Sequence, residues 1–410
     1  MKRRTLLKGI AVTGLGLMAG TRIAQAQNPG IKIGVLTDMS SAYSDVTGES
    51  DVVAAKMAAA DFMRENPSIP VEVVSADFQL KADIASNVAR QWYDLEGVDA
   101  IASLPFSSAA LAASELAKAK DKVVLMTSTG LPDMTGKHCT MNQVQWTMDT
   151  FALSTSMASY LVEQGKKSWF FIVPDYSVGH SMANDAAKTV EKLGGKVVGS
   201  AVYAFPGTSD FSSYLLQAQN SGAEVICLAN AGSDTINCVK QAFEFGLPQS
   251  GITLATIVFN DYVAHAIGVD QAQGIVAALP FYWDTNDDTR AFAIEFSKQR
   301  GGMPPNFFNA GIYSAVTHYL KAVKEMGVEK AKASGKAAIA QMKAMPVQDK
   351  LFQPGKIRED GKHIHPITVY RVKSKDKMAG ERDYFEPLHT VPGEQAFMSL
   401  EDLACPLLKS

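Results

Sequence analysis

The chain has no strong excess of charge of either sign. It contains 39 lysine and arginine residues against 42 aspartate and glutamate residues, which gives a formal net charge of −3 over 410 residues. This balance provides no basic surface of the kind that binds nucleic acids or anionic membranes. Beyond residue 26, no apolar run is long enough for a transmembrane helix. We therefore expect no nucleic-acid partner and no membrane-embedded segment.

The first 26 residues have the features of an export signal. A charged start with a twin-arginine pair, Arg3-Arg4, precedes an apolar run over residues 10–19 and a small-x-small cleavage site, Ala24-Gln25-Ala26. A retained N-terminal anchor is the alternative, which the cleavage site disfavours. We expect a periplasmic protein. The arginine pair is compatible with twin-arginine export, although ordinary export signals also contain paired arginines.

The four cysteines lack the spacing of a zinc site, and we expect neither a metal nor a cofactor. Cys227 lies in an apolar strand-like run and Cys238 in the segment after it, so both are expected to be buried thiols. Cys139 and Cys405 lie in polar, loop-like sequence. Because an exported chain meets oxidising conditions, we predict a Cys139–Cys405 disulfide that holds the C-terminal tail.

Short apolar runs alternate with amphipathic, helix-length stretches along most of the chain. The strand-like runs lie at residues 31–37, 71–76, 99–104, 123–127, 169–173, 196–203, 224–229, 252–259 and 274–279. Apolar strands separated by helices are typical of parallel sheets covered on both faces. A single nine-stranded sheet is possible. We favour an α/β fold with two doubly wound parallel-sheet lobes, because residues 142–150 interrupt the alternation.

The length also suits two domains, and the order of elements indicates that both are discontinuous. After a second break at residues 280–284, only helical stretches precede a late β-like segment, so the chain is expected to return to the first sheet. We expect a three-strand hinge near residues 145–149, 280–284 and 352–356. The expected units are a signal peptide (1–26), lobe 1 (27–146 and 284–352), lobe 2 (147–283 and 353–385) and a C-terminal tail (386–410).

Several stretches occur in an order that is similar to a known family. They are IKIGVLTDMSSAYSDVTGE, SLPFSSAA, VVLMTSTGLPDMTG, WFFIVPDYSVGHSM, FPGTSDFSSYLLQAQNSGAEVICLANAG and FNAGIYSAVTHYLKAV. Together they resemble the branched-chain amino acid-binding family of type I periplasmic solute-binding proteins of ABC importers. The resemblance implies a non-enzymatic, monomeric carrier. Its two lobes would close on a small-molecule ligand and deliver it to an inner-membrane permease.

The resemblance also implies ligand contacts in the loops at the strand ends. The residues that match are Ser41, Ala42, Tyr43, Ser107, Ser108, Thr127, Ser128, Thr129, Tyr176, Val178, Asn230, Asn260, Asp261 and Phe308. Ser107 and Ser108 open a predicted helix, whose N-terminal N–H groups can hold a carboxylate without a cation. Serine is also a preferred helix cap, so a purely structural role is the alternative.

The sequence constrains the identity of the ligand less than it constrains the binding loops. Amino acid-binding relatives pair the ligand ammonium with an acidic residue of the second lobe, which here could be Asp261. The alternative role for that residue is to cap the helix that begins near Tyr262. The aromatic residues of 280–284 and the Phe307-Phe308 pair indicate a roomy apolar cleft. A hydrophobic amino acid and an aromatic carboxylate are close competitors, and we lean to the carboxylate.

Three other interpretations fit parts of the sequence. Residues 179–183, GHSMA, are similar to a hydrolase nucleophile elbow with Ser181 as nucleophile, but five residues separate them from the preceding strand and Ala183 replaces the last glycine. His363 and His365 could form a metal pair, but an exposed hairpin is favoured because no third ligand lies nearby. The same two-lobed fold could also serve a sensory receptor.

Overall fold

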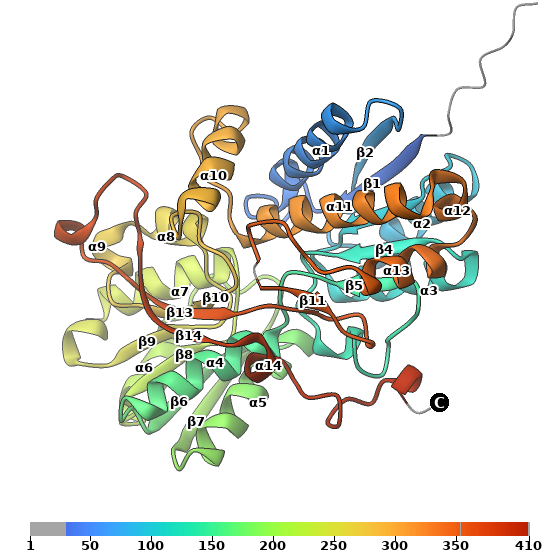
Figure 1. Cartoon of the computed structure of the whole chain (residues 1–410). Coiled ribbons are helices and arrows are strands. Elements are labelled where there is room, and N and C mark those ends of the chain that lie inside the picture. Colours follow the sequence, from blue (N-terminus) through green and yellow to red (C-terminus); the bar gives the residue numbers. More distant parts are fainter. Residues whose placement is uncertain (1–29, 353, 409–410) are drawn as a thin grey trace, which may run out of the picture.

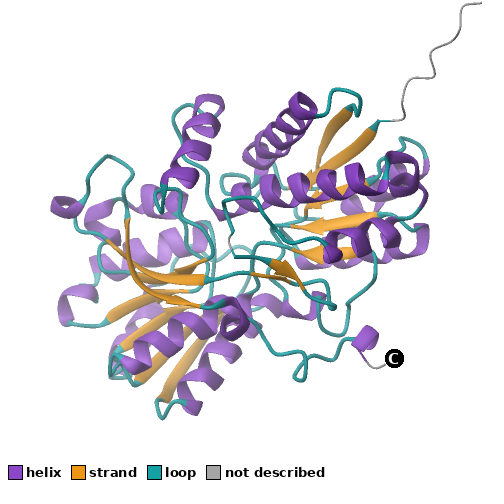
Figure 2. Ribbon diagram, viewed as in Figure 1, coloured by secondary structure: helices purple, strands orange, loops and turns teal. Residues whose placement is uncertain are grey.

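The computed structural model describes residues 30–352 and 354–408 (Figure 1). The predicted signal peptide, residues 1–26, lies outside the described residues. Within the described ranges, no helix combines the length and apolar character needed to cross a membrane. Two separate α/β lobes are visible, each a sheet with helices on both faces (Figure 2). The predicted fold class, two doubly wound lobes, is therefore confirmed.

The first sheet contains five parallel strands in the order β2-β1-β3-β4-β5. Helices α11 and α13 come from the later part of the chain, and they pack against α1 and β4, respectively. This return to the first sheet matches the sequence analysis. The elements are β1 (Ile31–Thr37), α1 (Gly48–Glu65), β2 (Val71–Asp77), α2 (Ala82–Asp94), β3 (Ala100–Ser103), α3 (Ser107–Lys120), β4 (Val123–Met126), β5 (Gln143–Gln145), α11 (Phe307–Met326), α12 (Val328–Ala333) and α13 (Gly335–Ala344).

The second sheet has seven strands in the order β14-β13-β10-β9-β8-β6-β7. Five strands are parallel, and β13 and β14 extend the sheet as an antiparallel edge. Its elements are α4 (Thr150–Glu163), β6 (Ser168–Pro174), α5 (Ser177–Lys192), β7 (Lys196–Tyr203), α6 (Ser212–Asn220), β8 (Val225–Leu228), α7 (Ser233–Glu244), β9 (Thr253–Thr256), α8 (Asp261–Ile267), α9 (Val269–Ala272), β10 (Val276–Leu279), β13 (Ile367–Val372) and β14 (Phe385–Val391). Helix α10 (Asp287–Gln299) follows β10 and packs against α1 of the first lobe.

Two expectations about the late part of the chain need correction. Strand β14 pairs with β13 through residue 391, so the expected tail from residue 386 begins inside the second sheet. The short pair β11 (Lys356–Ile357) and β12 (His363–Ile364) was expected in lobe 2. It lies beside the first sheet instead, since Gln145 of β5 forms a parallel bridge with Lys362.

The chain passes between the sheets after β5, after β10 and after β12. The third crossing follows β12 and therefore lies later than the predicted residues 352–356. It runs beside the first crossing, where the imidazoles of His363 and His365 contact the carbonyl oxygens of Trp146 and Thr147 at 3.1 and 2.8 Å. Both histidines are buried, so the predicted exposed hairpin was wrong. No group of three potential metal ligands occurs in the described part of the chain.

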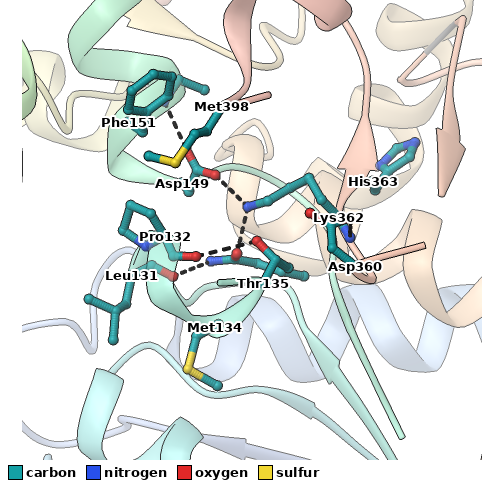
Figure 3. A network of polar contacts seen from close by, with 12 residues as sticks. Leu131, Pro132, Met134, Thr135, Asp149, Phe151, Asp360, Lys362, His363 and Met398 are labelled. Atoms are coloured by element: carbon teal, nitrogen blue, oxygen red, sulfur yellow. Dashed lines mark hydrogen bonds and ion pairs between the residues drawn. The ribbon is translucent and has the colours of Figure 1, made fainter. Parts of the chain in front are cut away.

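A buried cation joins these crossings (Figure 3). The Lys362 ammonium lies 2.6 Å from Asp149 and donates to the Gln145 side-chain oxygen at 2.5 Å. Asp149 also accepts from the Ala152 backbone N–H at 2.7 Å and so caps α4. One side chain immediately before β12 therefore ties the end of β5 to the first helix of the second lobe.

The sulfur atoms of Cys139 and Cys405 form a disulfide, with their Cα atoms 5.6 Å apart. This is the pair expected from the sequence. Cys227 and Cys238 are free and buried, also as expected. The disulfide fastens the residues after β14 to the loop before β5 on the first lobe.

Candidate functional site

A pocket lies between the two sheets, at the carboxyl ends of parallel strands of both. Ligand sites of open α/β folds occur at this position. None of its lining residues carries a charge, and many are apolar or aromatic. The lining residues are Tyr43, Val46, Thr47, Pro105, Phe106, Ser107, Ser128, Gly130, Met148, Thr150, Tyr176, Val178, Met182, Ala231, Gly232, Val258, Asn260, Val263 and Phe308.

The pocket is surrounded by the starts of helices. Seven helices of the described chain, from both lobes, contribute lining residues at or beside their first turn: α1, α3, α4, α5, α7, α8 and α11. A helix N-terminus exposes unpaired N–H groups and carries a partial positive charge. The site is therefore favourable for an anion although no lysine or arginine lines it.

Helix α3 presents one of these ends without a side-chain cap. Its N-cap residue is Phe106, whose side chain cannot accept a hydrogen bond, and its first i to i+4 bond runs from Ala110 N–H to the Phe106 carbonyl. The backbone N–H groups of Ser107, Ser108 and Ala109 consequently have no acceptor within the helix. Ser107 is the first helical residue and not the cap, so the capping role weighed in the sequence analysis does not apply to it.

Seven of the sequence-derived candidates line the pocket: Tyr43, Ser107, Ser128, Tyr176, Val178, Asn260 and Phe308. Others lie just outside it. Ala42 contacts the second lobe, where a Cβ added at Gly232 would lie 3.1 Å from the Ala42 carbonyl oxygen. The residues that do not line the pocket are Ser41, Ala42, Ser108, Thr127, Thr129, Asn230 and Asp261.

Local hydrogen bonds explain why several of these residues do not line the pocket. The Ser41 backbone N–H donates to Asp38 at 3.0 Å, and the Thr129 hydroxyl donates to the Leu104 carbonyl at 2.5 Å. The Asn230 side-chain oxygen accepts from Thr235 at 2.8 Å. Sequence alone could identify the correct loops but not which residue of each loop faces inward.

Asp261 is buried and does not line the pocket. Burial raises the pKa of its carboxyl to about 7. The helix cap that the sequence assigned to Asp261 as an alternative is made by Asn260, whose side-chain oxygen accepts from the Val263 N–H at 3.1 Å. No acidic residue thus lines the pocket as a partner for a ligand ammonium.

Sequence reasoning missed three polar residues at this site: Thr47 and Thr150, which line the pocket, and Asp51 behind its wall. Thr150 lines the pocket at the start of α4, is 1% exposed, and its hydroxyl has no hydrogen-bond partner among the described residues. Asp51 lies behind the pocket wall and accepts from Ser103, Ser128 and Asn309. The Asp149-Thr150 pair before an apolar run was a usable helix-start signal for Thr150. Nothing local distinguished Asp51 from an exposed residue of an amphipathic helix.

The hydrolase interpretation finds no support in the geometry. Ser181 lies within α5, and its hydroxyl donates to Asp185 at 3.2 Å, one helical turn away. His180 pairs with Asp175 at 2.8 Å instead of contacting Ser181. Ser181 also does not line the pocket.

The fold and site define a two-lobed binding protein with an uncharged pocket between its lobes. A periplasmic binding protein family model matches residues 30–377, and the chain belongs to that family. This family binds solutes and is not enzymatic.

Solved structures agree with this assignment. The chain is 38% identical to a periplasmic binding protein from Burkholderia mallei, with a TM-score of 0.85 over 92% of this chain and 99% of that one. It is 34% identical to a branched-chain amino acid ABC transporter ligand-binding protein from Burkholderia xenovorans LB400, with a TM-score of 0.83 and the same coverage. A solute-binding protein from R. palustris in complex with 4-hydroxybenzoate shares the fold at 20% identity, with a TM-score of 0.79 over 91% of this chain and all of that one.

Proposed function

We propose that this protein is the periplasmic substrate-binding component of an ABC uptake transporter and that it captures a small aromatic carboxylate between its lobes. The observation that carries the proposal is the uncapped N-terminus of α3 at a pocket without charged side chains. Backbone N–H groups and the helix dipole hold a carboxylate there. The ligand is delivered to an inner-membrane permease, and the carrier works as a monomer.

The lining favours an aromatic acid over an amino acid. Tyr43, Phe106, Tyr176 and Phe308 supply aromatic surface around the pocket. A ligand ammonium would lose its water without gaining an anionic partner, because Asp261 is directed elsewhere, and that loss is costly. The relative from R. palustris that binds 4-hydroxybenzoate supports the same ligand class. The relative described as branched-chain amino acid-binding keeps the amino acid as the competing candidate.

Contacts between the lobes support capture by closure. The Ser50 hydroxyl of α1 lies 3.3 Å from the Tyr262 hydroxyl of α8, and Gly232 contacts Ala42. A ligand that touches both lobes stabilises the closed arrangement because it makes its full set of contacts only there. The closed form is the one that a permease recognises. A sensory partner reading the same closure is the alternative function.

The carboxylate subsite can be tested by removing a backbone N–H. Proline is tolerated at the first position of a helix, and Phe106 already has the extended backbone preferred before proline. Ser107→Pro should therefore fold but bind a carboxylate roughly 10- to 100-fold more weakly, since a hydrogen bond to a charged group contributes about 1.5–3 kcal/mol. Ser107→Ala keeps the N–H and should lose much less. Asp287→Pro, at the first position of α10, is the matched control for whether the fold tolerates proline at a first helical position.

Ligand class is tested by calorimetric titration and thermal shift. The panel contains benzoate- and cinnamate-type acids, leucine and phenylalanine. A ligand at 100 times its Kd adds about 2.7 kcal/mol of apparent stability. Stabilisation by the aromatic acids, weakened in Ser107→Pro, is expected. Stabilisation by amino acids alone would overturn the ligand assignment, and unchanged small-angle scattering at saturation would contradict closure.

A further inference from the structure

The carboxylate of Asp51 is buried behind the lobe 1 wall of the pocket and receives only neutral partners. One oxygen accepts from the Ser103 hydroxyl at 2.7 Å and the Ser128 hydroxyl at 3.2 Å, and the other accepts from the Asn309 amide at 2.9 Å. Its side chain is fully buried, and it takes part in no ion pair with another described residue. Three hydrogen-bond donors converge on its two oxygens, which is the arrangement that an ionised carboxylate accepts, although burial raises its pKa to about 6.

This arrangement fixes the direction of one hydrogen bond inside the pocket. Ser128 lines the pocket and is 5% exposed. A serine hydroxyl has one proton and two lone pairs, and an ionised carboxylate can only accept. The Ser128 proton is therefore directed to Asp51, and the lone pairs of its oxygen remain for the ligand. A ligand atom beside Ser128 must be a hydrogen-bond donor.

The position of Ser128 relates this donor to the ligand carboxylate. Ser107 follows β3 and Ser128 follows β4, and these strands are direct neighbours in the first sheet. Neighbouring strands lie about 4.8 Å apart. A ligand whose carboxylate lies at the start of α3 thus brings a substituent on the adjacent carbon toward Ser128. Since no charged residue lines the pocket, a neutral hydroxyl suits this position better than an ammonium.

We infer that Asp51 is a positioning residue that makes Ser128 a hydrogen-bond acceptor, so that the pocket selects 2-hydroxy carboxylates over the same acids without the hydroxyl. The inference rests on the proposed function, because it takes the ligand to be an aromatic carboxylate held at α3. Asp51 does not touch the ligand. It acts by fixing the orientation of the hydroxyl that does.

Matched ligands test the inference directly. Mandelate and phenylacetate differ only in a 2-hydroxyl group, as do phenyllactate and 3-phenylpropanoate. Phenylalanine completes the second set with a 2-ammonium group. Calorimetric titration of the full-length mature protein should show the hydroxy acid of each pair binding roughly three- to tenfold more tightly, the range expected for one neutral hydrogen bond.

Variants separate positioning from a general structural effect. Ser128→Ala removes the acceptor and should bring the affinity ratio of each pair close to one. Asp51→Asn should also reduce the ratio, because a carboxamide offers one acceptor atom to three donors. Ser103→Ala removes the other hydroxyl on the same carboxylate without altering the pocket lining, so the ratio should persist. Affinity ratios within one variant are insensitive to a uniform loss of folded protein.

The outcomes distinguish the inference from the proposed function. If the aromatic acids bind but the hydroxyl gives no advantage, or the advantage survives in Ser128→Ala, the inference is wrong and the proposed function stands. Tighter binding of phenylalanine than of phenyllactate would likewise overturn the hydroxyl assignment. Binding of none of the carboxylates would overturn the proposed function, and the inference with it.

Discussion

Replacing Lys362 with methionine should destabilise the protein strongly, because it leaves a buried carboxylate without its cation. The side chains of Lys362 and Asp149 are 1% and 3% exposed and their charged atoms lie 2.6 Å apart. Removing one partner of such a buried pair costs about 3–5 kcal/mol. An unfolding entropy near 2.1 cal/mol/K per residue gives about 0.8 kcal/mol/K for a chain of this length. The expected fall in Tm is therefore about 4–6 °C.

Two further variants test the reasoning behind this value. In the double variant Lys362→Met/Asp149→Asn, the orphan charge is absent and asparagine still caps α4, so the double variant should regain at least half of the lost stability. Lys356→Met breaks an exposed pair with Glu394, whose side chains are 62% and 61% exposed. That change should alter Tm by about 1 °C or less.

Differential scanning calorimetry at pH 7, with circular dichroism as a second probe, measures these changes. A Tm for Lys362→Met within 1 °C of the wild type would show that the Asp149 charge is solvated or neutral in the folded protein. A double variant less stable than the single variant would refute the orphan-charge argument itself. Either result would require another explanation for how β12 is held against β5 and α4.

Three other predictions concern stability. Because burial raises the pKa of Asp51 from 3.8 to about 6, the folded state binds more protons than the unfolded state between these values, and stability should fall by about 2 kcal/mol as pH rises from 4 to 6. Asp51→Asn should flatten this part of a urea-unfolding series, and an unchanged slope would contradict the prediction. Gly311→Ala places a methyl group against Thr147 of the first crossing and should lower the free energy of unfolding by about 1–3 kcal/mol. If the clash is the cause, adding Thr147→Ala should restore part of this stability. The double variant Cys139→Ala/Cys405→Ala opens a loop that spans 266 residues and should lower the free energy of unfolding by about 2–5 kcal/mol. Hydrogen exchange should become faster only in the segment after β14. A uniform increase in exchange would argue against a local role of the disulfide.

Sequence patterns identified strands whose side chains are apolar and failed where buried side chains are polar. The nine apolar runs all contain strands. Strand β5 was missed because two of its three residues are glutamines, yet both are fully buried. The Gln145 amide donates to the Thr129 carbonyl at 2.8 Å, and the Gln143 amide donates to the Met134 carbonyl. These partners lie 16 and 9 residues earlier in the chain, outside the span of the alternation that predicts a strand.

The same limit applies to the third crossing and to the pocket. His363 and His365 were expected in an exposed hairpin, and no role was predicted for Lys362. Each of the three side chains instead contacts a backbone or side-chain oxygen at the first crossing. At the pocket, the resemblance identified the right strand-end loops. Whether Ser107 or Ser108 faces inward depends on where the first turn of α3 begins, and uncertainty of one residue at a helix boundary is enough to exchange them.

Aspartates behind the pocket wall offset the positive ends of several helices that begin there. Four of the helices that begin there carry an aspartate at or within one turn of their start: Asp51 in α1, Asp149 before α4, Asp234 in α7 and Asp261 in α8. Asp51 is directed to Ser103 and Asn309, Asp149 to Lys362, and Asp234 to the Tyr203 hydroxyl at 2.7 Å. These carboxylates offset the positive helix ends from behind the wall, where they do not occupy the pocket. Helix α3 has no acidic residue in its first turn. Helix α5 likewise has no acidic residue in its first turn and no side-chain cap, so the starts of α3 and α5 are the least compensated of these ends. A ligand carboxylate should bind at one of them, and the Ser107→Pro variant tests the start of α3.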